Sequence, residues 1–299
     1  MSEAAPSRQP AGNIYDLGYR HYEGVRLGRS YAARSLFVYS FWSVWGIGRS
    51  WMAKLFPMGL AAIALIPALI LLAIAALAPD EFEVAKPEDY YGFVSIVLAL
   101  FCAVAAPELV GRDQRQRTLA LYFSRALSRF DYASTKVAAL VLSLFLVLVV
   151  PQVFLQVGNG VAADSLSDYF KDNLDVLPPI IASSAIVAVF MGAISLAIAI
   201  QTPRRAFAMG AVIAAFAILS ALGGILVNTV TGDAQKYALL ISPFGLLEGL
   251  VYWVFSVEPP FDSNVTKAGL DGVFYFVASI AYAALALAIV YRRIERMGV

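Results

Sequence analysis

The amino-acid sequence predicts an all-α integral membrane protein with six transmembrane helices. Of its 299 residues, 60% are hydrophobic and only 14% are charged, whereas a soluble domain carries roughly a quarter charged residues. The apolar residues gather in runs of about 20, the length that crosses a hydrocarbon layer. Most of the basic residues lie in every second segment between these runs, which places them on one side of the membrane. Together these observations favour a multi-pass protein.

Six apolar runs are long enough to span a bilayer. The second run is the shortest, and Tyr90 and Tyr91 at its start are typical of a membrane interface. The predicted spans are 57–78, 91–106, 133–157, 178–200, 206–230 and 272–291.

The residues before the first span are amphipathic rather than uniformly apolar. Residues 1–30 are polar, and we expect them to form a cytoplasmic N-terminal segment without a cleavable signal peptide. In residues 31–56, aromatic side chains alternate with Arg34, Arg49 and Lys54, as in helices that lie in the inner membrane interface. We interpret 31–56 as an interfacial elbow helix, and an extra span over 36–48 is the alternative.

The distribution of lysine and arginine predicts the orientation. With the N-terminus inside, the inner segments are 1–56, 107–136, 201–205 and 292–299, and they contain 18 of the 22 basic residues and every arginine. The outer segments contain 14 of the 21 acidic residues. Because lysine and arginine near span ends resist translocation, we expect both termini in the cytoplasm of a bacterial cell, with the protein in the plasma membrane.

Residues 237–257 form a further apolar run, but a seventh crossing would carry Arg292, Arg293 and Arg296 outside. Pro243, Gly245 and Gly249 would also interrupt a lipid-facing helix. We therefore predict outer re-entrant helices, whose broken backbone is covered by protein.

The most informative segment is the basic loop 107–136 between the second and third spans. From Thr118, the apolar residues Leu119, Phe123, Leu127 and Phe130 fall at helical spacing. This pattern predicts a cytoplasmic amphipathic helix that offers one face to a soluble partner.

Several kinds of chemistry are excluded or disfavoured. The chain has no Gly-Lys dipeptide, so it carries no phosphate-binding P-loop. One histidine (His21) and one cysteine (Cys102) leave no His- or Cys-based metal site, and we expect neither a metal nor a cofactor, nor catalytic residues, in this chain. No charged residue lies in the middle of a span, which disfavours an ion-coupled carrier.

The basic loop contains a series of short motifs, and a further motif stands before the last span. They are Pro107-Glu108-Leu109, Arg112-Asp113, Arg117-Thr118-Leu119, Ser124-Arg125, Ser128-Arg129 and Lys136, together with Ser242-Pro243-Phe244 before the last span. With these motifs and this layout, the chain resembles the ABC-2 family of ABC-transporter permeases. Ala126 and Thr135 depart from the proline and glycine common in that family.

The resemblance implies a type V-like exporter fold and a division of labour. A second permease copy, identical or related, would pair with this chain, and two cytoplasmic ABC ATPase subunits would bind ATP and Mg. The implied cargo is lipid-like or amphipathic, and no nucleic acid is involved. The implied ATPase-coupling residues are Glu108, Arg112, Asp113, Arg115, Arg117, Thr118, Leu119, Phe123, Arg125 and Arg129, with Pro243, Phe244 and Glu248 as an outer gate.

Three other functions fit parts of the sequence. An ion-coupled carrier or channel would need a charged residue in mid-membrane. A membrane-embedded enzyme would need acids or histidines clustered at neighbouring span ends. A membrane anchor that recruits a soluble partner would share the docking helix but would not need re-entrant helices.

Overall fold

The computed structural model describes residues 23–24, 27–77, 86–124, 127–162, 169 and 171–297. Within these ranges the protein is all-α, and six helices are long and apolar enough to cross a membrane, as predicted. These six are α2 (Trp51–Leu77), α3 (Pro87–Arg115), α5 (Arg129–Ala162), α7 (Leu177–Ala199), α8 (Arg205–Thr229) and α12 (Gly272–Arg296). Most of them extend beyond the predicted apolar runs into the polar flanks.

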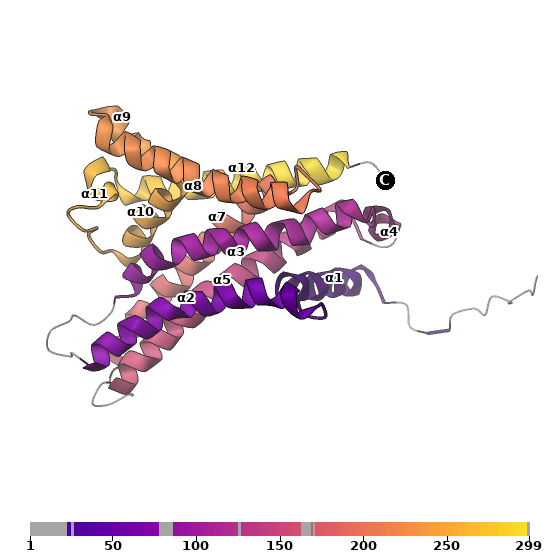
Figure 1. Cartoon of the computed structure of the whole chain (residues 1–299), viewed down its shortest axis with the longest axis horizontal. Helices are drawn as coiled ribbons and strands as arrows, with labels where there is room; N and C mark the ends of the chain where they lie inside the picture. The colour runs from indigo at the N-terminus through magenta and orange to yellow at the C-terminus, as the bar shows by residue number, and fades with distance from the viewer. Residues whose placement is uncertain are drawn as a thin grey trace, which may run out of the picture.

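Shorter helices cluster at the two ends of the bundle. Figure 1 shows α1 (Arg29–Val44), α4 (Leu119–Phe123) and the last turns of α12 at one end, which we name the basic end. The opposite end carries α9 (Asp233–Ala238) and α11 (Asn264–Ala268). Two short 3-10 helices, η1 (Leu174–Val176) and η2 (Leu239–Ile241), and α10 (Pro243–Phe255) complete the described elements.

The elbow helix is shorter than predicted. It ends at Val44, and residues 51–56 belong to α2 instead. The chain turns at Gly46 and Gly48, which both have positive φ. A Cβ atom at Gly46 would lie 2.4 Å from the Ala53 carbonyl oxygen, so only glycine fits this close turn. The turn divides residues 31–56 between two helices. The pattern of aromatic and basic residues had predicted one continuous helix there.

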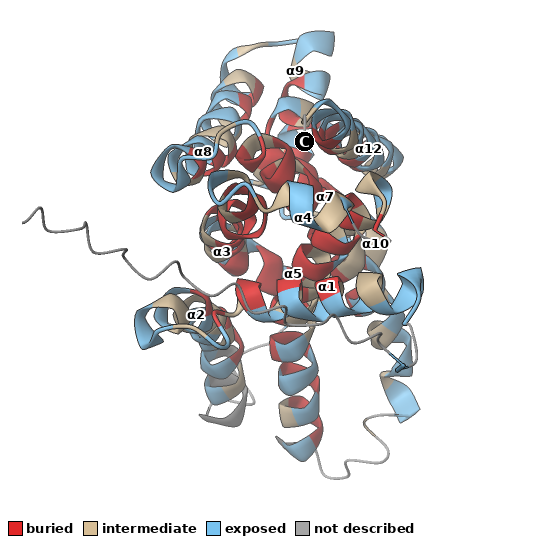
Figure 2. Ribbon diagram, turned by 90° about the vertical axis from the view of Figure 1, so that its right-hand side faces the viewer, coloured by how far each residue is buried: buried red, intermediate tan, exposed pale blue. Residues whose placement is uncertain are grey.

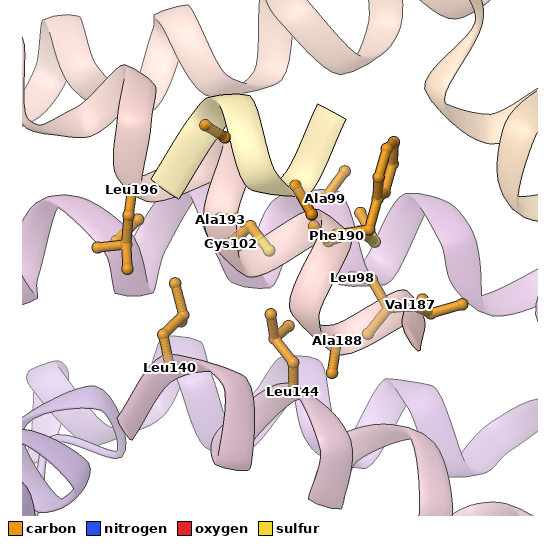
Figure 3. Close-up of a cluster of buried hydrophobic side chains, with 14 of the residues drawn as sticks. Leu98, Ala99, Cys102, Leu140, Leu144, Val187, Ala188, Phe190, Ala193 and Leu196 are labelled. Carbon is orange, nitrogen blue, oxygen red and sulfur yellow. The ribbon is translucent and has the colours of Figure 1, made fainter. Parts of the chain in front are cut away.

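Helices α3 and α7 are the most buried of the spans, as Figure 2 shows by colour. Small residues line their contact and let the backbones approach closely, as membrane helices require. Ala99 and Cys102 of α3 meet Ala193 of α7, beside Leu140 and Leu144 of α5 (Figure 3). Cys102 is therefore a packing residue, fully enclosed in the bundle.

The apolar segment before the last span is bent. Helices α9 and η2 together meet α10 at 102°, so the pair is a re-entrant element or a broken span and not a straight seventh helix. Ser242 begins α10, and its Oγ accepts a hydrogen bond of 2.9 Å from the Gly245 amide. Pro243 follows at the first helical position, where its missing N–H costs nothing. This local chemistry explains why the chain turns here.

Candidate functional site at the basic end

Helix α4 is a single short turn that packs onto the bundle through one side only. Leu119, Tyr122 and Phe123 are half-buried against the core. Leu121 is 67% exposed, and Arg115 and Arg117 beside it are also exposed. The basic end thus presents an apolar side chain and two guanidinium groups together.

The predicted amphipathic helix from Thr118 to Phe130 is wrong in its length. Helix α4 ends at Phe123 and α5 begins at Arg129. As a result Leu127 is buried, whereas Phe130 is 63% exposed and stacks on Tyr291 with ring centroids 5.3 Å apart. The four apolar residues do not share one face.

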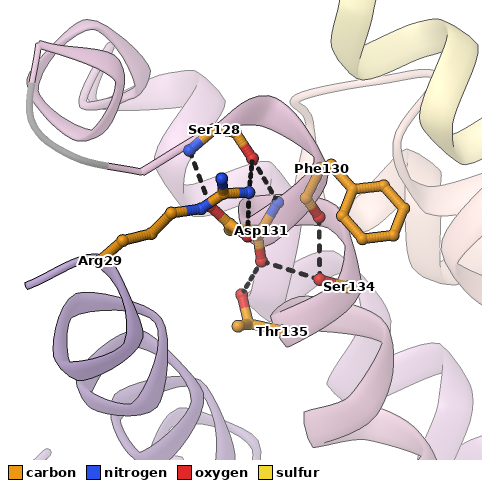
Figure 4. Close-up of polar contacts among 6 residues, drawn as sticks. All are labelled: Arg29, Ser128, Phe130, Asp131, Ser134 and Thr135. Atoms are coloured by element: carbon orange, nitrogen blue, oxygen red, sulfur yellow. Dashed lines mark hydrogen bonds and ion pairs between the residues drawn. The ribbon is translucent and has the colours of Figure 1, made fainter.

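The reason for the break is a reciprocal cap at the start of α5, drawn in Figure 4. The Ser128 amide donates to Asp131 Oδ2 at 2.9 Å, and the Asp131 amide donates to Ser128 Oγ at 3.1 Å. Such a capping box satisfies two amides that a helix start leaves without partners, so it favours a new helix at this point.

The same cap binds the first residue of α1. Arg29 makes two charge-assisted hydrogen bonds to the Asp131 carboxylate, at 2.7 and 2.9 Å, and a third to Ser128 Oγ at 3.1 Å (Figure 4). Arg29 itself is largely exposed. We therefore expect this pair to fix the position of α1 more than to stabilise the fold.

A buried ion pair joins α3 and α5 close to α4. Lys136 Nζ is 2.8 Å from Asp113 Oδ2, and both side chains are more than nine-tenths buried. Tyr132 donates its hydroxyl to the same carboxylate oxygen at 2.8 Å. A buried pair needs such additional hydrogen bonds to offset the loss of water around its charges.

Tyr132 connects this pair to α4. Its ring lies 5.8 Å from that of Tyr122 and 5.9 Å from that of Phe123. Burial, together with the nearby charge of Asp113, raises the pKa of Tyr122 to about 12. The phenol stays neutral near pH 7, so α4 carries no negative charge into this contact. Tyr132 therefore contacts both α4 and the buried carboxylate.

Glu108 of α3 forms a second buried centre. Its carboxylate pairs with Arg49, in the turn between α1 and α2, and lies 3.6 Å from Arg205 Nη1 at the start of α8. The Glu108 side chain is 7% exposed. One carboxylate therefore joins three segments that are far apart in the sequence.

Backbone carbonyls complete the connections. Arg115 donates to the Pro203 carbonyl at 2.7 Å, and Gln114 donates to the Ile200 carbonyl at 3.2 Å. Arg129 donates to the Glu295 carbonyl of α12 and lies over the Phe123 ring at 5.6 Å. The end of α3 is thereby tied to the α7–α8 loop, and the start of α5 to α12.

The predicted coupling residues separate into a buried and an accessible group. Glu108 and Asp113 are buried in ion pairs within the chain, Arg112 is half-buried, and Thr118 packs beside the Asp113 carbonyl. Arg117 is exposed with φ of 52°, which is unusual for a residue other than glycine. Arg125 lies outside the described residues.

The sequence did not indicate several members of this network. Arg29, Arg49, Arg205 and Tyr132 join it through contacts that span long stretches of chain. A local signal existed only for the capping box, because Ser128 and Asp131 have the required spacing.

The predicted outer-gate residues lie together near the start of α10. Pro243 is buried, and Phe244 stacks on Phe216 with ring centroids 6.1 Å apart. Glu248 is half-buried and lines a cavity between α3 and α10.

Fold and site together define a multi-pass, all-helical membrane protein. No protein-family model matches the sequence, and no curated protein matches it significantly. Within the described part of the chain, no three His, Cys, Asp or Glu side chains are placed to hold a metal ion.

Proposed function

We propose that this chain is the membrane-spanning subunit of an ATP-driven transporter of the ABC-2 permease type, with its basic end in the cytoplasm. The observation that carries the proposal is the position of α4. This exposed turn rests on Tyr132, which binds the buried Asp113–Lys136 pair. A soluble protein that binds α4 therefore acts on the interior of the bundle.

In the proposed mechanism, a P-loop ATPase contacts the exposed side chains of Leu121, Arg115 and Arg117. ATP binding and hydrolysis change the shape of the ATPase, and the resulting displacement of α4 is passed through Tyr132 to α3 and α5. A partner shifts a conformational equilibrium only by its differential affinity for the two states. The ATPase must therefore bind α4 with different affinities before and after ATP hydrolysis.

The ion pairs of Glu108 extend the displacement to other helices. Arg49 and Arg205 attach the α1–α2 turn and the start of α8 to the same end of α3. Ion pairs of this kind are either formed or broken. They therefore favour a switch of the helix bundle between two distinct packings over a gradual deformation. In the complete transporter, two permeases and two ATPases assemble, ATP and Mg bind to the ATPases, and the cargo is lipid-like or amphipathic.

Co-purification tests the proposal. The tagged permease is co-expressed with candidate P-loop ATPases, and Arg115 and Arg117 are both replaced by Glu. Because like charges across an interface cost several kcal/mol, recovery of the ATPase should fall about tenfold or more. The matched control is Arg292→Glu with Arg293→Glu, which reverses two exposed charges on α12 at the same end. That variant should keep its ATPase.

Two results would contradict the proposal. One is equal ATPase recovery and activity with the Arg115/Arg117 variant and the parent chain. The other is solute movement driven by an ion gradient when the purified chain alone is placed in vesicles. The latter would favour an ion-coupled carrier.

A further inference from the structure

A cavity of about 560 Å³ lies at the opposite end of the molecule, between the first turns of α3 and the middle of α10. Figure 1 shows these two helices side by side near α11. Glu88, Asp89 and Glu248 line its wall, and none of the described residues that line it is a lysine, an arginine or a histidine. The described part of the wall therefore combines three acidic residues with no basic side chain.

Glu88 is the unusual member of this set. The residue is only 8% exposed, and within the described part of the chain its carboxylate forms neither a hydrogen bond nor an ion pair. Its oxygens are not among the fully buried polar atoms without a partner, so they remain accessible from the cavity that the residue lines. Glu88 lies in the first turn of α3, where the partial positive charge of the helix N-terminus attracts carboxylates. Among the described residues, no lysine or arginine pairs with this carboxylate.

The remaining wall is aromatic. Tyr91, Phe244 and Tyr252 line the cavity together with Phe93. The Tyr91 hydroxyl is already bonded to Ser183 and Ser184, at 2.6 and 2.9 Å, so it is not available to a ligand. Aromatic faces attract cations through their negative π surface, and more strongly when water is displaced. Carboxylates and aromatic rings together are the chemistry that recognises organic ammonium groups.

We propose that this cavity binds an amphiphilic organic cation. Its charged group pairs with Glu88 and Glu248, and its apolar part lies against the aromatic wall. A bare metal ion does not fit, because the described carboxylates are not grouped closely enough to ligate one. Glu88 lies at the very start of a span, so the cation sits at the level of the lipid headgroups. This inference concerns binding only and does not rest on the proposed function.

Equilibrium binding of tetraphenylphosphonium to the purified chain in nanodiscs tests the proposal, with tetraphenylborate as a probe of the same shape and opposite charge. The parent chain should bind the cation and not the anion. Glu88→Gln combined with Glu248→Gln should weaken cation binding about tenfold or more, because hydrogen bonds and contacts to charged groups are the strong ones. Asp262→Asn removes an exposed carboxylate at the same end, outside the cavity, and should bind like the parent chain.

Varying the lipid of the nanodisc distinguishes the possible sources of the natural ligand. If phosphatidylethanolamine competes with the probe and phosphatidylglycerol does not, the occupant is the amine headgroup of a lipid. If neither lipid competes, the occupant is a free cationic amphiphile. Equal binding of the two probes, or unchanged affinity in a double variant that is shown by size exclusion to be folded, would overturn the proposal.

Discussion

At the scale of single residues, the basic end divides its charges by exposure. Glu108 and Asp113 are acidic residues of the basic loop 107–136, and both are buried. Each forms an ion pair with a basic side chain of the same chain. Arg115 and Arg117 remain accessible to another molecule. The carboxylates therefore hold helices together, and in our proposal the arginines meet the partner.

Lys136 provides the sharpest residue-level prediction. Lys136→Met leaves the Asp113 charge buried without its cation, so unfolding should become easier by about 3–5 kcal/mol. Asp113→Asn combined with Lys136→Met removes both charges and should recover most of this loss. Thermal unfolding of the purified variants in detergent measures the difference.

The control for that prediction is the exposed pair. Arg29→Met breaks the contact with Asp131 at the surface, where water replaces the lost partner, and should lower the unfolding temperature far less than Lys136→Met does. If Lys136→Met were as mild as Arg29→Met, the buried pair would not stabilise the bundle.

At the scale of helices, close contacts depend on glycine. Helix α8 meets the start of α10 at Gly223, where an added Cβ would lie 2.5 Å from the Ser242 Cβ. Gly223→Ala should therefore force the bent pair away from α8 and lower the free energy of unfolding by about 1–3 kcal/mol.

The neighbouring glycine is the matched control. At Gly224 the nearest atom to an added Cβ is 3.8 Å away, an ordinary contact. Gly224→Ala should be neutral or stabilise the helix by up to about 1 kcal/mol. Equal unfolding temperatures for the two variants would show that α8 and α10 do not pack as described.

The six spans could be predicted from the sequence because apolar length is a local property of the chain. The turn at Gly46 and the break before Ser128 are also local, but they were not predicted. The pattern of residues 31–56 gave no sign of the turn, and the helical spacing of the apolar residues from Leu119 to Phe130 gave no sign of the break. The pairing of Arg49 with Glu108 could not be predicted, because the two residues are 59 positions apart and no spacing rule links them. Likewise, the start of α3 meets α10 only in three dimensions, so Glu88 carried no signal of a cavity.

At the scale of the whole molecule, the segregation of charge predicts the orientation in the membrane. The native Cys102 is fully buried and should stay unlabelled by a membrane-impermeant maleimide. Phe261→Cys, at a site 91% exposed at the opposite end, should label in intact cells. Arg117→Cys should label only after lysis.

The reverse labelling pattern would place the basic end outside the cell. It would also contradict the role proposed for α4, because a cytoplasmic ATPase could not reach it.

The most direct test of the central claim is a site-specific photo-crosslink from α4 in cells. A photoreactive residue at Leu121, whose side chain is 67% exposed, should crosslink to the partner ATPase, and the yield should change when ATP hydrolysis is blocked. The same residue at Phe261 should give no ATPase product. A chain that crosslinks to no ATPase from Leu121 while assembled and active in transport would contradict the account.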